Sequence, residues 1–201
     1  MIAADFAAFP TGNLCNADPR VRPLPSGLCP LIAGRRIAGL ARTARITPGQ
    51  NGAIHRAVHN ARPGDVLVVD GAGSDRWGPF GDILAEAAMA KGIVGAIFDC
   101  TIRDSADIAA LGFPVFCRGF HPEATAKTDP GETDIDLVLG GVRVAPRDII
   151  VADDDGIVVI PQGIAGDVLK SVRQVAQRED AIRARLKAGE TTYEIFELGP
   201  R

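Results

Sequence analysis

The chain has 201 residues, of which 46% are hydrophobic and 23% charged, a composition typical of a globular protein with a substantial core. It carries 22 lysine and arginine residues against 25 aspartate and glutamate residues, and the net charge of −3 excludes the basic excess that nucleic-acid binding requires. Apolar runs such as Gly92–Phe98 are far shorter than the roughly 20 residues that cross a bilayer, and the first ten residues carry no cationic side chain, so we expect a cytoplasmic protein without a membrane segment.

The first part of the chain has few regular patterns. Residues 1–50 are rich in proline and glycine and weakly periodic, although Ala33–Thr47 has room for a strand or two. Asn51–Ala61 has the pattern of a helix that Pro63-Gly64 ends. The β-branched run Val66–Asp70 predicts a short buried strand.

The middle of the chain alternates helical and strand patterns. We expect helices over Asp82–Lys91 and Ser105–Leu111, and strands over Ile93–Phe98 and Pro114–Cys117. Strands and helices that alternate in this way form βαβ units, in which the strands are parallel and the crossovers right-handed. The sequence therefore predicts an α/β fold.

The last part of the chain predicts three short strands and one long helix. The strands are expected over Val138–Val144, Asp148–Ala152 and Gly156–Ile160, in a second sheet, and Gly163–Ala188 has the pattern of an amphipathic helix. No internal repeat, low-complexity stretch or linker divides the chain. We therefore expect one domain over residues 1–201.

Three features that could indicate other chemistry are weak. The loop Asp70–Gly73 follows a strand, but Arg76 stands where a dinucleotide fingerprint needs its third glycine, so we expect a structural turn. His55 and His59 have a spacing that can bind zinc, but the glutamate of metalloproteases is absent between them, which favours capping or packing roles. The cysteines form no zinc or redox motif, and we expect reduced thiols with two of them buried; they are Cys15, Cys29, Cys100 and Cys117.

Polar residues gather where two of the predicted strands lead into helices. Gly81-Asp82-Ile83-Leu84 opens one helix, and Arg103-Asp104 precedes another. Carboxyl ends of parallel strands meet at one edge of a sheet, where α/β proteins bind ligands. The helix start offers free backbone N–H groups to an anion, Arg103 suits a carboxylate, and Asp104 is a hard oxygen ligand for Mg²⁺ or Mn²⁺. An Arg103–Asp104 ion pair, with Asp104 as N-cap of the next helix, explains the same residues, and both interpretations stay open.

Several segments between Gly64 and Pro161 resemble one known family. The most specific feature is Asp82 followed, after a gap of twenty residues, by Arg103-Asp104. The other matching segments are Pro63–Asp70, Gly81–Ala85, Pro114–Phe116 with Lys127, Gly140–Val142 and Val151–Gly156. On these residues the chain resembles the RraA-like family, in particular its class II 4-hydroxy-4-methyl-2-oxoglutarate / 4-carboxy-4-hydroxy-2-oxoadipate aldolases.

The resemblance implies a single α/β/β/α domain with a parallel βαβ core and a C-terminal helix, assembled as a trimer or hexamer with active sites between subunits. It implies a lyase that uses Mg²⁺ or Mn²⁺ to cleave 4-hydroxy-2-oxo dicarboxylic or tricarboxylic acids to pyruvate. Decarboxylation of oxaloacetate is expected through the same pyruvate enolate. The partners are then a small 2-oxo acid and further copies of the chain, with neither nucleic acid nor membrane.

The resemblance also implies roles for individual residues. Arg103 binds the pyruvyl part of the substrate and stabilises enolate charge, while Asp104 anchors the metal ion. Asp82 positions a water molecule that protonates the enolate carbon, and Lys127 neutralises substrate charge near the pocket. Glu179 matches an acid that reaches in from a neighbouring subunit. The carboxylate of the substrate is expected on the backbone at the helix start, namely at Gly81, Ile83 and Leu84.

Two other functions remain as alternatives. Lys127 could form a Schiff base, but its acidic neighbours Glu123 and Asp129 favour the charged ammonium, which is not nucleophilic. A non-catalytic regulator that binds ribonuclease E shares the family fold, but this branch typically lacks the Arg-Asp pair. Departures from relatives at His121-Pro122-Glu123 and Arg76-Trp77 leave the distal part of the substrate open.

Overall fold

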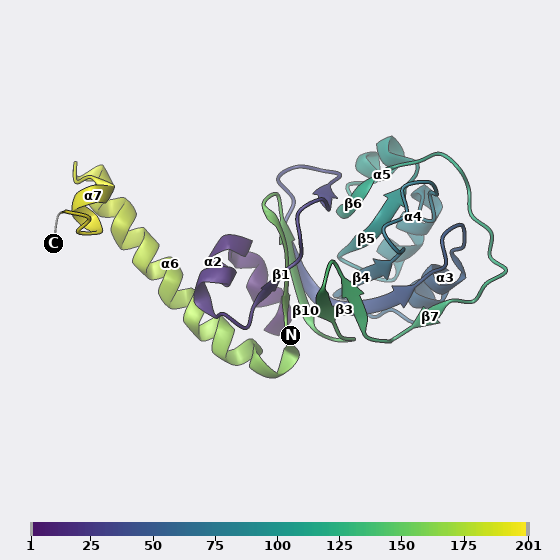
Figure 1. The fold of residues 1–201 in the computed structure, drawn as a ribbon, viewed down its shortest axis with the longest axis horizontal. Helices are drawn as coiled ribbons and strands as arrows, with labels where there is room; N and C mark the ends of the chain where they lie inside the picture. The colour runs from purple at the N-terminus through teal and green to yellow at the C-terminus, as the bar shows by residue number, and fades with distance from the viewer. Residues whose placement is uncertain (1, 200–201) are drawn as a thin grey trace.

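Four parallel strands form the centre of the fold in the computed structural model, which describes residues 2–199 (Figure 1). Their neighbours are in the order β3-β4-β5-β6. Most of their side chains are apolar and buried on both faces, as expected for parallel strands covered on both sides. The bounds are β3 Ile37–Arg45, β4 Asp65–Asp70, β5 Gly95–Ile102 and β6 Val115–Phe120. The predicted parallel βαβ core is confirmed.

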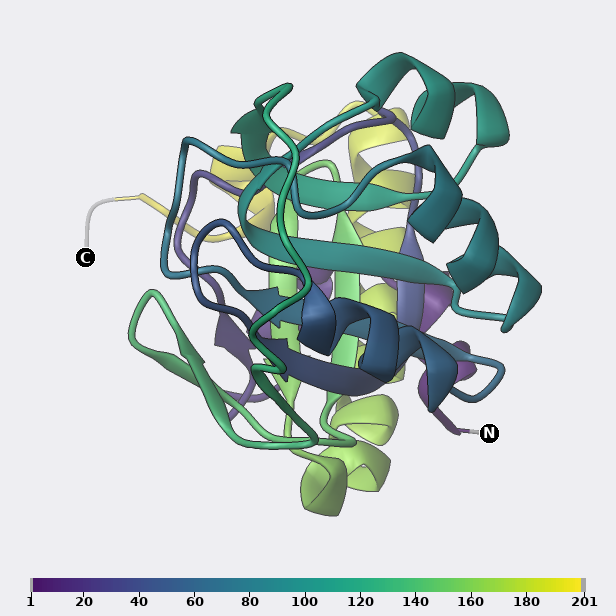
Figure 2. The same cartoon turned by 90° about the vertical axis from the view of Figure 1, so that its right-hand side faces the viewer.

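Three helices cover one face of these strands, and Figure 2 shows them in front of the sheet. Ile54, Ala85 and Ile108 of these helices pack with Leu67 and Phe98 of the strands in one buried cluster. The helices are α3 Gly52–His59, α4 Asp82–Ala90 and α5 Ser105–Leu111. All three follow the expected helical patterns to within two residues at each end.

Two of the three strands predicted for a second sheet, β10 (Ile149–Asp153) and β11 (Gly156–Ile160), continue this sheet, so the prediction was wrong for them, and only the segment at Val138–Val144 forms a separate sheet, of two strands. β10 pairs with the free edge of β3, and β11 pairs with β10. Within residues 2–199, the sheet has nine strands, in the order β1-β11-β10-β3-β4-β5-β6-β2, with β7 also on β3. The short strands are β1 Arg22–Pro23, β2 Cys29–Pro30 and β7 Glu132–Thr133.

The sheet folds over so that its two halves face each other. Ile97 and Phe116 of the parallel half share one buried cluster with Ile150 and Val159 of the antiparallel half, and Figure 2 shows β10 and β11 crossing behind the parallel strands. Helices cover the outside of both halves. The described residues are therefore layered as α/β/β/α.

A small hairpin replaces the single strand that was expected over Val138–Val144. It consists of β8 (Leu137–Leu139) and β9 (Val142–Val144). Gly140 and Gly141 both have positive φ, at +53° and +85°, which is the conformation of a two-residue hairpin turn. Leu137, Leu139 and Val144 are buried in the cluster between the halves.

The outer layer on the antiparallel half consists of N-terminal helices and the long helix α6. Leu14 of α2 and Leu169 of α6 pack against Val158 and Ile160 of β11. Only the first part of α6 is buried, and Figure 1 shows the rest projecting away from the fold. The elements are α1 Ile2–Asp5, η1 Phe6–Ala8, α2 Thr11–Ala17, η2 Gln162–Ile164, α6 Ala165–Lys187 and α7 Thr192–Ile195.

No helix within residues 2–199 is long and apolar enough to cross a membrane. Cys100 and Cys117 are buried, whereas Cys15 and Cys29 are exposed, and all four thiols are free. Burial raises the pKa of Cys117 to about 11 and raises that of Cys100 as well. The two buried thiols therefore stay protonated and pack as small apolar side chains.

A buried ion cluster holds the start of β4 in place. The carboxylate of Asp65 is 1% exposed and accepts hydrogen bonds from Arg42 at 3.1 and 3.2 Å, from Arg147 at 3.0 Å and from the backbone N–H of Arg62 at 3.0 Å. Arg42 is itself buried. Loss of the carboxylate would leave the buried Arg42 guanidinium with only one carboxylate, that of the more exposed Asp134 at 2.6 Å.

We therefore expect Asp65→Ala to lower the free energy of unfolding by roughly 3–5 kcal/mol, as measured by urea denaturation. Asp75→Ala, at an exposed carboxylate in the loop after β4, is the control and should change this energy by about 0.5 kcal/mol or less. Equal effects of the two substitutions would show that the ion cluster does not stabilise the fold.

Candidate active site

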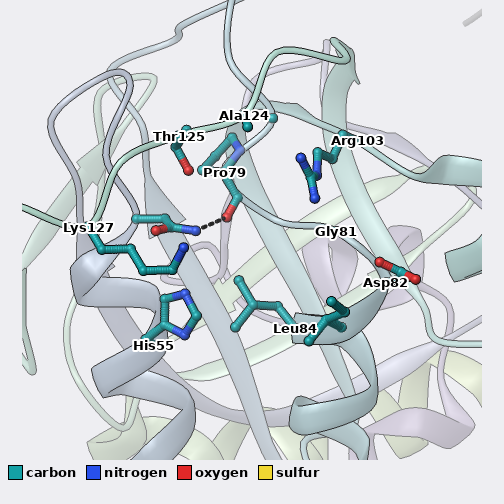
Figure 3. A pocket seen from close by; sticks show the side chains of 12 residues that line it. His55, Pro79, Gly81, Asp82, Leu84, Arg103, Ala124, Thr125 and Lys127 are labelled. Carbon is teal, nitrogen blue, oxygen red and sulfur yellow. Dashed lines mark hydrogen bonds between the residues drawn. The ribbon is translucent and has the colours of Figure 1, made fainter.

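A cavity of about 230 Å³ lies where the parallel strands lead into their helices (Figure 3). Its walls come from the start of α3, the loop before α4, the start of α4, the end of β5 and the segment 124–127. Parallel strands present their loops and helix N-termini at this edge, which is where α/β proteins bind ligands.

Arg103 follows β5 and places its guanidinium in one wall of the cavity. Its backbone N–H donates to the carbonyl of Phe80 at 3.0 Å. A Cβ at Gly78 would lie 2.6 Å from the Cβ of Arg103, and a Cβ at Gly81 would lie 3.1 Å from its Nε. The two glycines therefore leave the space that the arginine side chain occupies.

Asp104 lies beside Arg103 in an uncommon backbone conformation. It has φ +55° and ψ +38°, in the left-handed region, where aspartate is one of the few residues tolerated. Its Oδ2 lies 3.1 Å from Nε of Arg103, and its carboxylate makes no capping hydrogen bond to α5. Of the structural interpretation weighed from sequence, the ion pair is present, and Asp104 occupies the N-cap position of α5 without making a cap hydrogen bond.

The start of α4 presents free backbone donors. Ala85 N–H donates to Gly81 at 3.0 Å, whereas the N–H groups of Asp82, Ile83 and Leu84 have no acceptor among residues 2–199. These three residues line the cavity. An anion placed there would satisfy the free donors and interact favourably with the positive end of the helix dipole.

The opposite wall combines the start of α3 with the segment 124–127. Asn51 N–H donates to Ala126 at 3.0 Å, and Ala126 N–H donates to Gly49 at 2.9 Å. This pairing brings Lys127 opposite His55 on α3 (Figure 3). Burial, and secondarily the charge of Lys127, lower the pKa of His55.

The cavity includes most of the residues predicted from sequence. Gly81, Asp82, Ile83, Leu84, Arg103 and Lys127 line it. Asp104 does not line it and lies behind Arg103, in contact with its guanidinium. Glu179 lies elsewhere, on α6, where it accepts hydrogen bonds from Asn13 at 3.2 Å and Arg183 at 2.9 Å. Figure 1 shows α6 on the opposite side of the fold from α3, α4 and α5, so the chain does not bring Glu179 to its own cavity.

Three polar residues of the site were not predicted from the sequence, namely Asn51, His55 and Thr125. A signal existed for the first two, because α3 follows β3 and so starts at the same edge of the sheet. His59 is also exposed on α3, but it does not line the cavity.

The segments Arg76-Trp77 and His121–Glu123, which were expected to affect substrate choice, contact each other outside the cavity and do not line it. The guanidinium of Arg76 lies 4.8 Å from the ring centre of Trp77 and forms an ion pair with Glu123 at 3.3 Å. Glu123 N–H donates to Nδ1 of His121 at 3.2 Å, and the Glu123 carbonyl accepts from Gly78 at 2.9 Å. These two segments are thus connected to the cavity through Gly78, which lines it.

The residues present fit a metal ion that keeps most of its water. No cluster of three or more His, Cys, Asp or Glu side chains within residues 2–199 could hold a metal by itself. Mg²⁺ commonly uses one or two carboxylates and retains several waters. Asp104 offers such a carboxylate, since it makes no cap bond and is partly exposed.

Comparison with known proteins finds one family. The family model described as RraA-like, Aldolase/RraA, matches residues 11–159. A protein of Halalkalibacterium halodurans named "Putative 4-hydroxy-4-methyl-2-oxoglutarate aldolase" is 37% identical over 180 residues, which cover 90% of this chain and 85% of that protein. A protein of the same name from Aromatoleum aromaticum is 35% identical over 152 residues, covering 75% and 95%.

Solved structures of similar fold include an RNase inhibitor relative. The structure of a Streptomyces coelicolor protein, described as an unusual member of the RNase ES inhibitor RraA protein family, has a TM-score of 0.79 and 30% sequence identity. The match covers 90% of this chain and 95% of that one. The similar proteins thus include some that are named aldolases and one that is described as a member of an RNase inhibitor family.

The proximity of Lys127 and His55 predicts a measurable change in titration. In Lys127→Met the pKa of His55 should rise toward its ordinary value, because a nearby positive charge that opposes imidazolium formation is removed. NMR titration of the imidazole signals measures this pKa. Lys91→Met, at an exposed lysine that ends α4, is the control and should leave the pKa unchanged. No difference between the two variants would contradict the geometry of this wall.

Proposed function

The chain belongs to the RraA-like family, and we propose that it is a divalent-metal-dependent aldolase that cleaves 4-hydroxy-2-oxo dicarboxylic or tricarboxylic acids to pyruvate. Oxaloacetate decarboxylation, which passes through the same pyruvate enolate, is part of the proposal. One observation carries it: the Arg103 guanidinium and the free N–H groups at the start of α4 line the same cavity.

These groups match the carboxylate and the 2-oxo oxygen of a 2-oxo acid. The substrate carboxylate is held by the N–H groups of Ile83 and Leu84, which lack a protein acceptor. Arg103 donates to the 2-oxo oxygen. Its hydrogen bonds become stronger as that oxygen gains negative charge, so they stabilise the transition state more than the bound substrate.

The cleavage step conserves atoms and charge. The C3–C4 bond breaks, the 4-hydroxyl gives its proton to a water molecule as C4 becomes a carbonyl, and the bonding electrons remain on the pyruvate fragment as its enolate. A proton added at C3 then gives pyruvate. Asp82, at the first position of α4, orients the water that delivers this proton.

Asp104 is proposed to hold a Mg²⁺ or Mn²⁺ ion largely through or alongside water molecules. When bound, such an ion acts as a Lewis acid on the 2-oxo group. The Arg103–Asp104 contact at 3.1 Å keeps the guanidinium next to the carboxylate that would hold the metal ion. Lys127, on the opposite wall, neutralises the negative charge of the distal part of the substrate.

We also propose a trimer or hexamer in which Glu179 completes a neighbouring site. Two features support it: Glu179 does not reach the cavity of its own chain, and α6 projects from the fold (Figure 1). The C-terminal part also exposes apolar side chains that a neighbouring copy would cover, namely Leu186, Tyr193, Phe196 and Leu198.

Activity assays on site variants test the proposed function. Pyruvate release, coupled to lactate dehydrogenase, is expected with Mg²⁺ and is lost in excess EDTA. Arg103→Ala should lower kcat/KM by at least about 100- to 1,000-fold, because charge on the oxygen then has no fixed donor, and Asp104→Ala should lose both activity and its metal dependence. Full activity of either variant would contradict the proposal. Ribonuclease binding without pyruvate release would favour the regulator alternative.

Gly81→Ala tests the packing of the site. A Cβ at this position would overlap Oδ2 of Asp104, whereas its φ of −134° and ψ of −171° suit alanine. We therefore expect a folded protein in which the Asp104 carboxylate is displaced. Its kcat/KM should fall about 100-fold, since a displacement of about 1 Å is enough to disrupt the geometry of the reacting groups. Gly163→Ala, where nothing lies within 4 Å, is the control and should keep full activity. Equal activity of the two variants would contradict this account.

A further inference from the structure

One buried hydrogen-bond acceptor in the cavity wall has no partner. Asn51 is 7% exposed and lines the cavity. Its Oδ1 is buried and accepts no hydrogen bond from any group in residues 2–199. Buried acceptors are nearly always satisfied, and one that is left free at a ligand cavity indicates a group that the ligand brings.

The orientation of the Asn51 amide is determined by its other end. Nδ2 donates to the carbonyl oxygen of Pro79 at 3.0 Å, the dashed line in Figure 3. A carbonyl oxygen only accepts, so the reversed amide would bring two acceptors together. Oδ1 is therefore the amide atom that remains for a ligand.

The protein does not provide the missing donor. Thr125 and Lys127 line the same side of the cavity (Figure 3), and His55 follows one turn later on α3, but none of the three donates to Oδ1. When Lys127 binds a distal carboxylate, the amide oxygen of Asn51 remains available to another part of the substrate.

We propose that Asn51 Oδ1 accepts a hydrogen bond from the 4-hydroxyl group of the substrate, which makes Asn51 the residue that selects 4-hydroxy-2-oxo acids over 2-oxo acids without this hydroxyl. The inference rests on the proposed function. At neutral pH the carboxylates and the 2-oxo oxygen of such a substrate can only accept hydrogen bonds, so the hydroxyl is its one donor. A neutral amide does not take up the proton, so Asn51 orients the hydroxyl and is not its base.

The test compares a substrate that has the hydroxyl with one that lacks it. In Asn51→Ala, kcat/KM for cleavage of 4-hydroxy-4-methyl-2-oxoglutarate should fall about tenfold more than kcat/KM for decarboxylation of oxaloacetate. Damage transmitted through Pro79 to the loop next to Arg103 would affect both reactions, and it cancels in the ratio. Asn60→Ala, the same change at the exposed other end of α3, is the control and should leave the ratio unchanged.

A second measurement needs no variant. Isothermal titration of the wild type, with Mg²⁺, compares 2,4-dihydroxyglutarate with 2-hydroxyglutarate, neither of which has the 2-oxo group that cleavage requires. The ligand with the 4-hydroxyl should bind about tenfold more tightly.

The outcomes separate the two proposals. An unchanged ratio in Asn51→Ala, or equal affinities for the two ligands, in an enzyme that releases pyruvate would overturn the inference alone. Absence of pyruvate release by the wild type from either substrate would overturn the proposed function and this inference with it.

Discussion

The position of the Arg103 side chain depends on two residues that have no side chain. Gly78 and Gly81 flank it, and a Cβ at either would crowd the arginine, at Gly81 also the Asp104 carboxylate. Because Gly81 is also the N-cap of α4, the packing that admits the arginine also leaves the first N–H groups of that helix without a side-chain cap. An arginine and an anion-binding helix start thus face one cavity, which is the arrangement that a 2-oxo acid head requires.

Sequence reasoning located this half of the site because its signals are local. The glycine-led start of α4 and the Arg103-Asp104 pair each follow a strand of the parallel core, and the edge rule for α/β sheets brings them together. Asn51 and His55 were missed although α3 also starts at this edge, because the wall is completed by the segment at Ala126, which pairs with residues far from it in sequence. Such irregular pairing leaves no periodic pattern to read.

The same distinction holds for the fold. The helices α3, α4 and α5 and the strands β4, β5 and β6 were predicted from periodicity, whereas β3 lies in a segment where the sequence was not decisive. The partner of β10 was not predicted, because local pattern does not determine which edge a strand joins. The Val138–Val144 segment was read as one strand since its apolar residues outweighed the Gly140-Gly141 turn signal. The short helices α1 and α2 have too few turns to show a helical period.

The central claim is that the cavity stabilises the enolate of pyruvate, and it can be tested apart from any choice of distal substrate group. NMR of pyruvate in D₂O, with the protein and Mg²⁺, follows the methyl protons at C3, which exchange with solvent only when the enolate forms. The account predicts exchange that requires Mg²⁺ and is lost in Arg103→Ala. Exchange no faster than without protein, or equal exchange in Arg103→Ala, would contradict it.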